Sequence, residues 1–442
     1  MAEGLTVMII GSGAREDTIA KAYGRSPRVE RIVVAPGNDF MPFKSEKISI
    51  EKKCDLKKPE TFLEIAKVHK PDIVDVAQDD ALAAGTVDMM RANGFRAFGP
   101  TKAAARIEWD KRWSREFMAG QKIPTPRFAY YEAEEPAIEY VKGLYTMEPQ
   151  KVVYVKAAGL CAGKGALKAT SFESAVEKIK KMKSFGEAGK TFLIEDGLIG
   201  EEFSCYAITD GEDYHIFKSA QDNKTVFNFD EGDQTGGMGA ISPAMVTGPI
   251  SKQIEETLIS RAIGGMASKG TPYQGVLYLG GMLTEGGPMN VEYNARWGDP
   301  ECQAVLPSVK TDYAEIVMAC LDGKLKSVHI EEDDKTRVCV AGASRGYPND
   351  YSKVKGKRIY GLEEAMETEN VTVLGAGIEV KDGNFRAAGG RLVSVVGEGR
   401  NIIEARHNAY SAMALISVEG NNLHYRTDIG WRDVERFLTS SR

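Results

Sequence analysis

Residues 288–301 read PMNVEYNARWGDPE and combine a strand pattern with closely spaced polar side chains. Successive strand residues point to opposite faces, so Glu292, Asn294 and Arg296 share one face. Carboxylate and amide oxygens suit Mg²⁺, and a neighbouring arginine can hold an anionic group. A solvated outer face is the alternative. It is less favoured because the following GDPE continues the polar cluster. The stretch therefore predicts a strand end that binds a metal ion and an anion.

The composition is that of an ordinary globular protein. Its 442 residues suggest roughly three domains. A net charge of −6 disfavours nucleic acid as a partner. The 6 cysteines are too sparse for a disulfide scaffold, so we expect reduced thiols. No apolar run is long enough for a membrane span or a signal-peptide core. We therefore expect a cytoplasmic α/β protein without a membrane partner.

Strand and helix patterns alternate along the N-terminal part of the chain. Residues 5–10, 31–37, 72–77 and 95–100 have strand patterns, and 81–94 reads as one helix. Short β-branched runs that alternate with helices predict a parallel sheet with right-handed crossovers.

The glycines after the first strand match a dinucleotide-binding turn only in part. Gly11 and Gly13 begin the pattern, but its third position holds Glu16, and the second strand ends without an acid. A nicotinamide cofactor, and with it an oxidoreductase, is therefore disfavoured. The backbone N–H groups could still face a ligand phosphate. A tight turn between strand and helix is an equally good interpretation.

The segment GLCAGKG, residues 159–165, resembles a P-loop but departs from its spacing. Gly165 stands where a P-loop has the hydroxyl side chain that holds the metal. Lys156 and Lys164 lie on either side of the loop, between the predicted strands 151–156 and 166–170. They could clamp a polyphosphate as mobile charges. The alternative is an ordinary hairpin.

Two further polar segments could complete a nucleotide and substrate site. In 192–204 the main chain at Asp196 and Leu198 could bind a nucleobase, while Glu202 and the nearby Glu195 face the nucleoside. The glycine-rich 233–243 could wrap a substrate with N–H groups, and Asp222 lies just upstream with Lys224. A flexible surface loop is the alternative for both. The scattered histidines and the absence of a G-x-S-x-G motif disfavour other catalytic classes.

The chain divides into four blocks, at 1–105, 106–195, 196–330 and 331–442. A helix at 109–121 begins the second block, and Ser171 is a candidate N-cap for the helix 171–183. The last block has strand patterns in VCVAGAS, VTVLGAGIEV and RLVSVVGEG, and a helix at 402–416.

Taken together, the motifs resemble the glycinamide ribonucleotide synthetase family. They occur in the order GSGARE, APGN, LAAGTVD, FGPTKAAA, IPTPRF, VKAAGLCAGKG, IGEEFS, AQDNK, TGGMGAISP, VEYNARWGDPECQ, GYP, GGR and HYRTDIG. The resemblance covers about residues 7 to 431. It implies an ATP-grasp fold with an N-terminal parallel-sheet domain, a small ATP lid, a central body and a β-rich C-terminal domain.

The implied reaction joins glycine to 5-phosphoribosylamine in de novo purine synthesis, with ATP and Mg²⁺ or Mn²⁺. ATP would phosphorylate the glycine carboxylate, and the amine would attack the acyl phosphate. Transient contact with neighbouring enzymes of the pathway is a further expectation. Another ATP-grasp carboxylate–amine ligase is the nearest alternative, and a nucleotide-binding regulator without turnover is a more distant one.

The resemblance also implies roles for individual residues. Lys111, Lys156 and Lys164 would contact ATP phosphates, with Lys164 and Arg296 catalytic. The adenosine site would comprise Glu195, Asp196, Leu198 and Glu202, and the metal ligands would be Glu292 and Asn294. Substrate contacts would come from Gly11, Gly13, Asp79, Asp222, Lys224, Thr235, Gly236, Gly237, Met238, Gly239, Arg296, Gly298 and Asp299.

Five positions depart from the family pattern. Asp17 stands in place of a histidine, and Asp79 in place of a longer glutamate. Asn223 replaces a histidine of AQDHK, and Gln234 replaces an asparagine. Gly280 stands where many ATP-grasp proteins have an acid or glutamine before the metal strand. These departures affect the expected substrate geometry and the coordination of the first metal.

Overall fold

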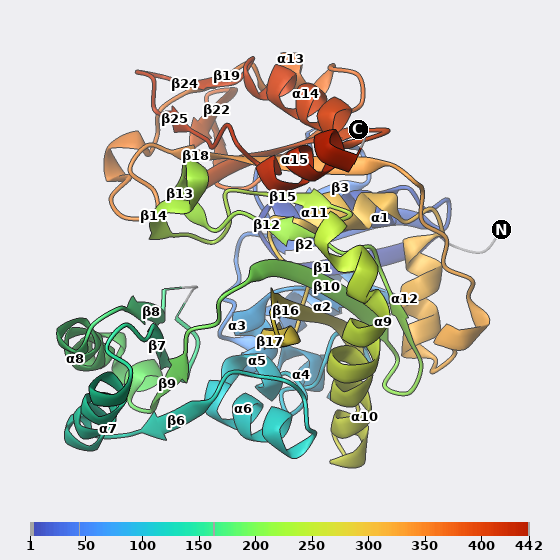
Figure 1. The fold of residues 1–442 in the computed structure, drawn as a ribbon. Coiled ribbons are helices and arrows are strands. Elements are labelled where there is room, and N and C mark those ends of the chain that lie inside the picture. Colours follow the sequence, from blue (N-terminus) through green and yellow to red (C-terminus); the bar gives the residue numbers. More distant parts are fainter. Residues whose placement is uncertain (1–3, 44, 162–163, 441–442) are drawn as a thin grey trace.

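The computed structural model describes residues 4–43, 45–161 and 164–440. Figure 1 shows the C-terminal domain stacked on the N-terminal and central parts, with a small lobe standing to one side. This arrangement of four parts follows the ATP-grasp organisation that the motifs predict.

The N-terminal segment folds into the predicted parallel sheet, in the order β3-β2-β1-β4-β5. Its central strands are buried on both faces, which explains their continuous apolar sequences. The strands are β1 Leu5–Gly11, β2 Val29–Pro36, β3 Ile48–Ile50, β4 Ile73–Val76 and β5 Ala97–Phe98, with helices α1 Ala14–Gly24 and α2 Pro59–His69.

The expected single helix over 81–94 is wrong. The segment forms α3, Asp79–Ala84, and α4, Thr86–Ala92, and the break falls at Gly85 with φ of 90°. This left-handed conformation ends α3, and it is one that glycine adopts without steric cost. The side-chain oxygen of Gln78 accepts hydrogen bonds from the N–H groups of Asp80 and Ala81 and so caps α3.

The second block contains a linking segment and the small lobe, which we call the lid (residues 128–196). The predicted helix 109–121 is divided at Asp110, whose side chain caps the second part by accepting from Trp113 N–H. Ser171 caps α8 as predicted. The lid sheet has the order β6-β9-β7-β8. The elements are α5 Arg106–Trp109, α6 Lys111–Gly120, β6 Phe128–Tyr131, α7 Glu134–Met147, β7 Val153–Ala157, β8 Ala166–Ala169, α8 Phe172–Lys181 and β9 Phe192–Asp196.

The central body is built on an antiparallel sheet in the order β11-β10-β16-β17. The last strand, β17, is the polar strand 288–294 of the sequence. The strands are β10 Glu201–Thr209, β11 Tyr214–Ile216, β16 Gly275–Thr284 and β17 Gly287–Asn294, with helices α9 Ser251–Ile254, α10 Ser260–Ser268, α11 Glu301–Val305 and α12 Tyr313–Leu321.

The C-terminal sheet recruits strands from the middle of the chain. Its order is β12-β15-β18-β23-β20, and β25 pairs with β18. Residues 239–242, within the glycine-rich motif, therefore join this sheet. The strands are β12 Gln221–Asp222, β15 Gly239–Ser242, β18 Thr336–Ser344, β20 Val371–Gly375, β23 Arg391–Gly399 and β25 Leu423–His424.

Smaller elements complete the domain. Residues 371–380, which read as one strand, fall into β20 and a separate β21. The pairs are β13 Thr225–Phe227 with β14 Glu231–Gln234, β19 Ile359–Tyr360 with β24 Ser417–Val418, and β21 Ile378–Lys381 with β22 Asn384–Ala387. The helices are α13 Leu362–Met366, α14 Ile402–Met413 and α15 Trp431–Ser440.

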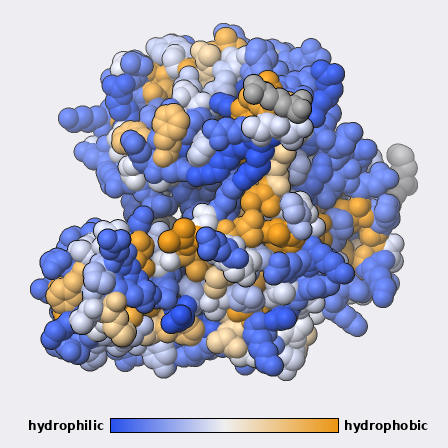
Figure 2. Space-filling view, viewed as in Figure 1, coloured by the Kyte–Doolittle hydropathy of each residue, from blue (hydrophilic) through white to orange (hydrophobic). Residues whose placement is uncertain are grey.

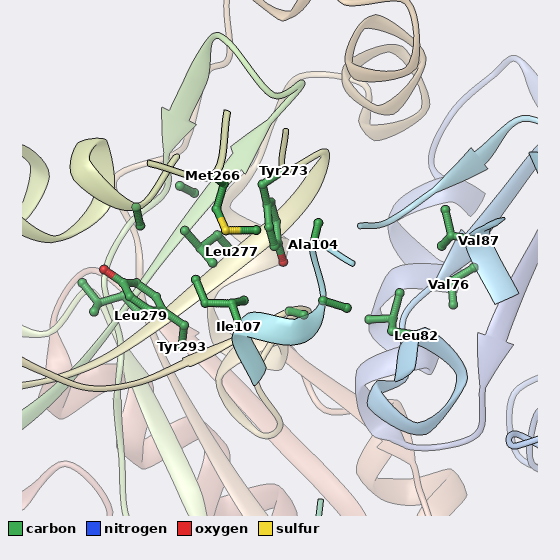
Figure 3. Close-up of a cluster of buried hydrophobic side chains, with 14 of the residues drawn as sticks. Val76, Leu82, Val87, Ala104, Ile107, Met266, Tyr273, Leu277, Leu279 and Tyr293 are labelled. Atoms are coloured by element: carbon green, nitrogen blue, oxygen red, sulfur yellow. The ribbon is translucent and has the colours of Figure 1, made fainter. Parts of the chain in front are cut away.

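One hydrophobic cluster joins the N-terminal domain to the central body. Figure 3 shows Val76, Leu82 and Val87 on the N-terminal side, and Met266, Tyr273 and Leu279 on the central side. Ala104, just before α5, and Ile107, on α5, lie between them. The two parts therefore share one core, which fixes the linking segment against both.

The surface is mostly hydrophilic in Figure 2, with an apolar patch beside the opening between the lid and the C-terminal domain. No helix in the described ranges is long and apolar enough to cross a membrane. All six cysteines are unpaired.

Candidate active site

A cavity of about 550 Å³ opens where the lid, the central sheet and the N- and C-terminal domains meet. Figure 2 shows the surface hollowed between the lid and the C-terminal domain. Most of the residues singled out in the sequence line this cavity. They are Gly13, Asp79, Lys111, Lys156, Glu195, Asp196, Leu198, Glu202, Asp222, Lys224, Thr235, Gly236, Glu292, Asn294, Arg296 and Asp299. Gly11, Lys164, Gly237, Met238, Gly239 and Gly298 lie outside this lining.

The end of β17 presents its polar side chains to the cavity. Gly280 on β16 pairs with Glu292, while Gly281 pairs with Asn290, so Val291 forms an irregularity in the strand. Such bulges re-aim side chains next to active sites. Burial favours the protonated form of Glu292, but Lys224, Lys156 and Lys111 outweigh this effect and lower its pKa. Glu292 is therefore an anion in the cavity.

The donor set at this strand end fits a hard divalent cation. Glu292 and Asn294 supply a carboxylate and an amide from one strand, both on the cavity wall. The described residues contain no cluster of three or more His, Cys, Asp or Glu side chains that could hold a metal. A pair of protein donors suits Mg²⁺, which is bound through one or two carboxylates together with substrate phosphates.

Arg296 is held firmly but keeps a free donor. Its Nη2 lies 2.9 Å from Glu108 Oε1 and 3.9 Å from Asp79 Oδ2. Its Nη1 donates to the carbonyl of Trp297 at 3.2 Å. The buried Nε has no hydrogen-bond partner among the described residues. The side chain of Arg296 is 18% exposed on the cavity wall, so its guanidinium is suited to an anionic ligand there.

Glu195 lies in a buried ion cluster. Arg115 Nε donates to its Oε1 at 2.6 Å, and Arg115 Nη2 donates to its Oε2 at 2.9 Å. Lys156 Nζ lies 2.7 Å from the same Oε2. Burial opposes ionisation, but the two cations outweigh it and lower the pKa of Glu195 to about 2. The carboxylate therefore orients Lys156 at the cavity wall.

The lid loop places its two lysines differently. Lys156 lines the cavity, whereas Lys164 Nζ donates to the carbonyl of Pro348 in the C-terminal domain at 3.5 Å. Lys111, at the start of α6, donates to the carbonyl of Gly159 at 3.4 Å. Residues 162–163 of GLCAGKG lie outside the described ranges. The described residues of this loop thus contact both the start of α6 and the C-terminal domain.

A second polar group lies on β10 and β12. Lys224 Nζ is 3.0 Å from Glu202 Oε2. Burial raises the pKa of Asp222 well above its usual value. Lys224 lowers this pKa, whereas the carboxylates of Glu301, Glu202 and Glu292 raise it further. Lys224 therefore serves as the counterion for an excess of carboxylates on this wall.

The glycine-rich segment is shaped by close packing. Gly237 has φ of +111°, and a Cβ there would lie 2.3 Å from Cδ of Pro300. A Cβ on Gly239 would meet the carbonyl of Cys339 at 2.5 Å. Thr235 Oγ1 donates to the carbonyl of Lys224 and accepts from Gly237 N–H. These contacts hold Thr235 and Gly236 at the cavity wall.

The glycine turn after β1 hydrogen-bonds to a side chain of the helix that follows it, α1. Gly13 N–H donates to Glu16 Oε2 at 2.7 Å, and Arg15 Nε donates to Glu16 Oε1 at 2.6 Å. Gly11 has φ of +141° and packs against the Glu16 side chain. The turn therefore presents the side chains of Arg15 and Glu16 to the cavity, while its Gly13 N–H is already used.

Family models of known proteins match three parts of the chain. Family models of phosphoribosylglycinamide synthetase match residues 5–108 (N domain), 109–302 (ATP-grasp domain) and 337–432 (C domain). The chain is 39% identical to a phosphoribosylamine–glycine ligase of Caldanaerobacter subterraneus, over 96% of this chain and 99% of that protein. The chain belongs to the phosphoribosylglycinamide synthetase family.

Other relatives agree with this membership in the phosphoribosylglycinamide synthetase family. A human trifunctional purine biosynthetic protein is 40% identical over 99% of this chain, which corresponds to 42% of its own length. The solved structure of a Thermotoga maritima phosphoribosylamine–glycine ligase has a TM-score of 0.81 at 31% identity, covering 96% of this chain and 100% of that one. The resemblance, the ATP-grasp fold and the prediction of an ATP-dependent ligase are thus confirmed.

Four of the positions that depart from the phosphoribosylglycinamide synthetase pattern can be placed in the structure. Asp17 is fully buried and accepts a hydrogen bond from Gly375 N–H at 2.8 Å, so it joins α1 to the C-terminal sheet. The main chain of Asn223 bonds to Gly239 and Met238, and Gln234 lines the cavity. A Cβ on Gly280 would lie 3.4 Å from Cγ of Glu292. Asp17 thus acts between domains, away from the cavity wall.

Several charged residues of the cavity were not singled out as site residues from sequence. They are Arg15, Glu16, Glu108, Arg115, Glu301 and Arg391. Arg15, Glu16, Glu301 and Arg391 stand inside quoted motifs, so their charge could have identified them. Glu108 and Arg115 lie on helices, where charged residues are common and carry no signal of their own.

Proposed function

We propose that the protein joins glycine to 5-phosphoribosylamine, converting ATP to ADP and phosphate and forming glycinamide ribonucleotide through glycyl phosphate. Family membership and the names of the full-length relatives support these substrates. The observation that carries the chemistry is the cationic side chain of Arg296, in the same cavity as Glu292 and Asn294. An anion acceptor and hard oxygen donors side by side suit phosphoryl transfer to a carboxylate.

The cavity has an end suited to the nucleoside. Apolar side chains line it beside the lid, from Met118, Pro126, Leu198, Met282 and Val291. An aromatic base would bury its faces there, with the main chain at Asp196 and Leu198 along its edge. Glu202, which pairs with Lys224 in this structure, would receive ribose hydroxyls once Lys224 turns to a phosphate. Glu195, by contrast, supports Lys156 through its ion pair.

The phosphates would extend from this end toward Glu292. Lys111 and Lys156 supply positive charge on the cavity wall, and we propose that Lys164 leaves the Pro348 carbonyl to join them. Glu292 and Asn294 would hold Mg²⁺ or Mn²⁺, which neutralises phosphate charge during transfer. The glycines at 159 and 165 give the lid loop the freedom that such a movement needs.

In the first step a carboxylate oxygen of glycine attacks the γ-phosphorus of ATP, and ADP leaves. Arg296 holds the carboxylate through its guanidinium and then the acyl phosphate, whose charge grows in the transition state. In the second step the amine nitrogen attacks the glycyl carbonyl carbon, inorganic phosphate leaves, and the nitrogen loses a proton. The protein supplies position and charge without a covalent nucleophile.

The phosphorylated sugar would occupy the part of the cavity between the N- and C-terminal domains. Arg15 and Arg391 provide cationic side chains there, with Thr235, Gly236 and Asp299 beside them. Fusion of the corresponding segment within the human trifunctional relative supports the further proposal that the protein works next to other enzymes of its pathway.

The decisive assay measures ADP release with glycine and freshly prepared 5-phosphoribosylamine, together with the mass of the product. We expect ADP release to require both substrates. Release with another acid–amine pair, and none with this pair, would favour a different ATP-grasp ligase. Glycine labelled with ¹⁸O in its carboxylate tests the intermediate, because one label should appear in the released phosphate. Unlabelled phosphate would exclude glycyl phosphate while leaving the ligase assignment intact.

A further inference from the structure

Glu108 is a buried carboxylate on the cavity wall that the proposed chemistry does not use. Its exposure is 7%, and it lies on α5, the short helix of the linking segment. Its neighbour Ile107 is 1% exposed and inserts into the core shared by the N-terminal and central parts (Figure 3). The backbone that carries Glu108 is therefore fixed from behind.

Both carboxylate oxygens of Glu108 hold the segment that follows β17. Oε2 accepts a hydrogen bond from Ala295 N–H at 2.7 Å. Oε1 lies 2.9 Å from Arg296 Nη2. Ala295 directly follows the proposed metal ligand Asn294, so one side chain fixes the main chain between Asn294 and Arg296 and the arginine itself.

The remaining contacts of Arg296 explain why this anchor matters for orientation. Nη1 donates to the Trp297 carbonyl, so Glu108 and Trp297 each take one terminal nitrogen of the guanidinium. This leaves the buried Nε without a protein partner. Asp79, at 3.9 Å from Nη2, is the competing carboxylate. Without Glu108 the guanidinium would turn toward Asp79 and leave its place on the cavity wall.

We propose that Glu108 is a positioning residue that holds the Arg296 guanidinium in place for the carboxylic-acid substrate and fixes the adjoining end of the proposed metal-binding strand. The proposal rests on the role assigned above to Arg296. Glu108 acts through Arg296 and Ala295 and does not itself touch glycine or ATP.

A purely structural role predicts different behaviour. Removing one partner of a buried ion pair destabilises a fold, because the other charge is left uncompensated. If Glu108 only supported folding, its replacement would lower stability and affect all substrates alike. If it directs Arg296, the defect falls on the carboxylic acid and leaves nucleotide affinity unchanged.

The test uses Glu108→Gln. An amide has one acceptor oxygen, so glutamine can keep the bond from Ala295 or the contact with Arg296, but not both. We expect kcat/KM for glycine to fall about 10- to 100-fold, the range that a lost charged hydrogen bond produces. Affinity for a non-hydrolysable ATP analogue should change less than about twofold, within ordinary surface-mutation effects. An equal loss for glycine and nucleotide would overturn the proposal.

Glu332→Gln is the matched control. Glu332 also accepts from a main-chain N–H, that of Lys218, and from a side chain, Ser308 Oγ, but it lies outside the cavity lining. It should leave kcat/KM for glycine unchanged. Glu108→Asp guards against a folding failure of the glutamine variant. It keeps the charge but is one methylene shorter, so it cannot span both contacts and should show the same selective defect.

A double-mutant cycle with Arg296→Gln tests whether Glu108 acts through Arg296 and whether Arg296 itself acts on glycine. If Glu108 acts through Arg296, Glu108→Gln should cost little more in the Arg296→Gln background, because coupled residues are not additive. Full additivity would contradict the positioning role of Glu108. If Arg296→Gln alone leaves kcat/KM for glycine unchanged, the role of Arg296 in the proposed function fails first.

Discussion

Arg391 of the C-terminal sheet pairs with Asp299, its Nη2 lying 3.1 Å from Asp299 Oδ2. Its Nη1 also donates to the carbonyls of Gly236, Gly237 and Asp299, at 2.8, 3.1 and 2.9 Å. One guanidinium thus joins the glycine-rich segment to the turn that follows β17. The C-terminal domain therefore contributes directly to the wall of the cavity.

Arg391→Met should impair use of the amine substrate more than use of ATP. The variant releases three carbonyls and the Asp299 carboxylate, so the two loops lose their common anchor. We expect kcat/KM for 5-phosphoribosylamine to fall at least about tenfold, as for other lost charged hydrogen bonds. Arg386→Met is the control, because Arg386 also donates to a carbonyl, that of Gly356, outside the cavity. Equal losses for both substrates would argue against this division.

Glu292→Gln should lower turnover far more than it changes folding stability. Lys224, Lys156 and Lys111 together lower the pKa of Glu292, so its anionic charge is available for a metal. Replacing that charge by an amide should weaken Mn²⁺ binding about tenfold or more. Electron paramagnetic resonance titration measures this binding without turnover. Unchanged metal affinity together with unchanged turnover would remove Glu292 from the site.

Gly237→Ala should disrupt the glycine-rich segment. The added methyl would overlap Cδ of Pro300 at 2.3 Å, on a backbone with φ of +111°. Overpacking and the left-handed backbone should together cost about 2 kcal/mol or more. Gly248→Ala is the matched control, since a Cβ there meets nothing within 4 Å. Urea unfolding of both variants measures the difference, and equal stabilities would contradict the packing argument.

Much of the fold and of the site is predictable because its signals are local. The parallel sheet follows from short apolar runs alternating with helices, and strand alternation predicts that Glu292 and Asn294 share a face. Arg296 lies beyond the strand, because β17 ends at Asn294. The helix break at Gly85 has no clear sequence signal, because a glycine inside a helical pattern is usually tolerated. Its left-handed conformation, which divides α3 from α4, becomes visible only in the structure.

The unpredicted part consists of partners that are distant in sequence. The sequence predicts Glu195 at the nucleoside. In the structure Glu195 accepts a hydrogen bond from Arg115, which lies on a different element, so this contact depends on the packed fold. The pairing of β15 with β18 depends in the same way on contacts across the chain. Charged residues on helices, such as Glu108, become identifiable only when their burial is known.

Asp75 offers a test of electrostatics inside the N-terminal domain. It is 3% exposed on β4 and accepts a hydrogen bond from Tyr23 Oη at 2.9 Å. Burial raises its pKa to about 7, and the bond from Tyr23 opposes the shift only in part. The folded state therefore binds a proton at Asp75 more tightly than the unfolded chain does.

This shift predicts that the Asp75 carboxyl destabilises the fold progressively as pH rises from about 4 to about 7. Below this window both states are protonated, and above it the full cost of the buried charge is present. Asp75→Asn removes the ionisation and keeps an acceptor for Tyr23. Its stability relative to wild type should increase across the window by a few kcal/mol, at about 1.4 kcal/mol per pKa unit. Urea unfolding at several pH values measures this, with Asp334→Asn as the control for net charge. A difference that stays constant with pH would show that Asp75 ionises alike in both states.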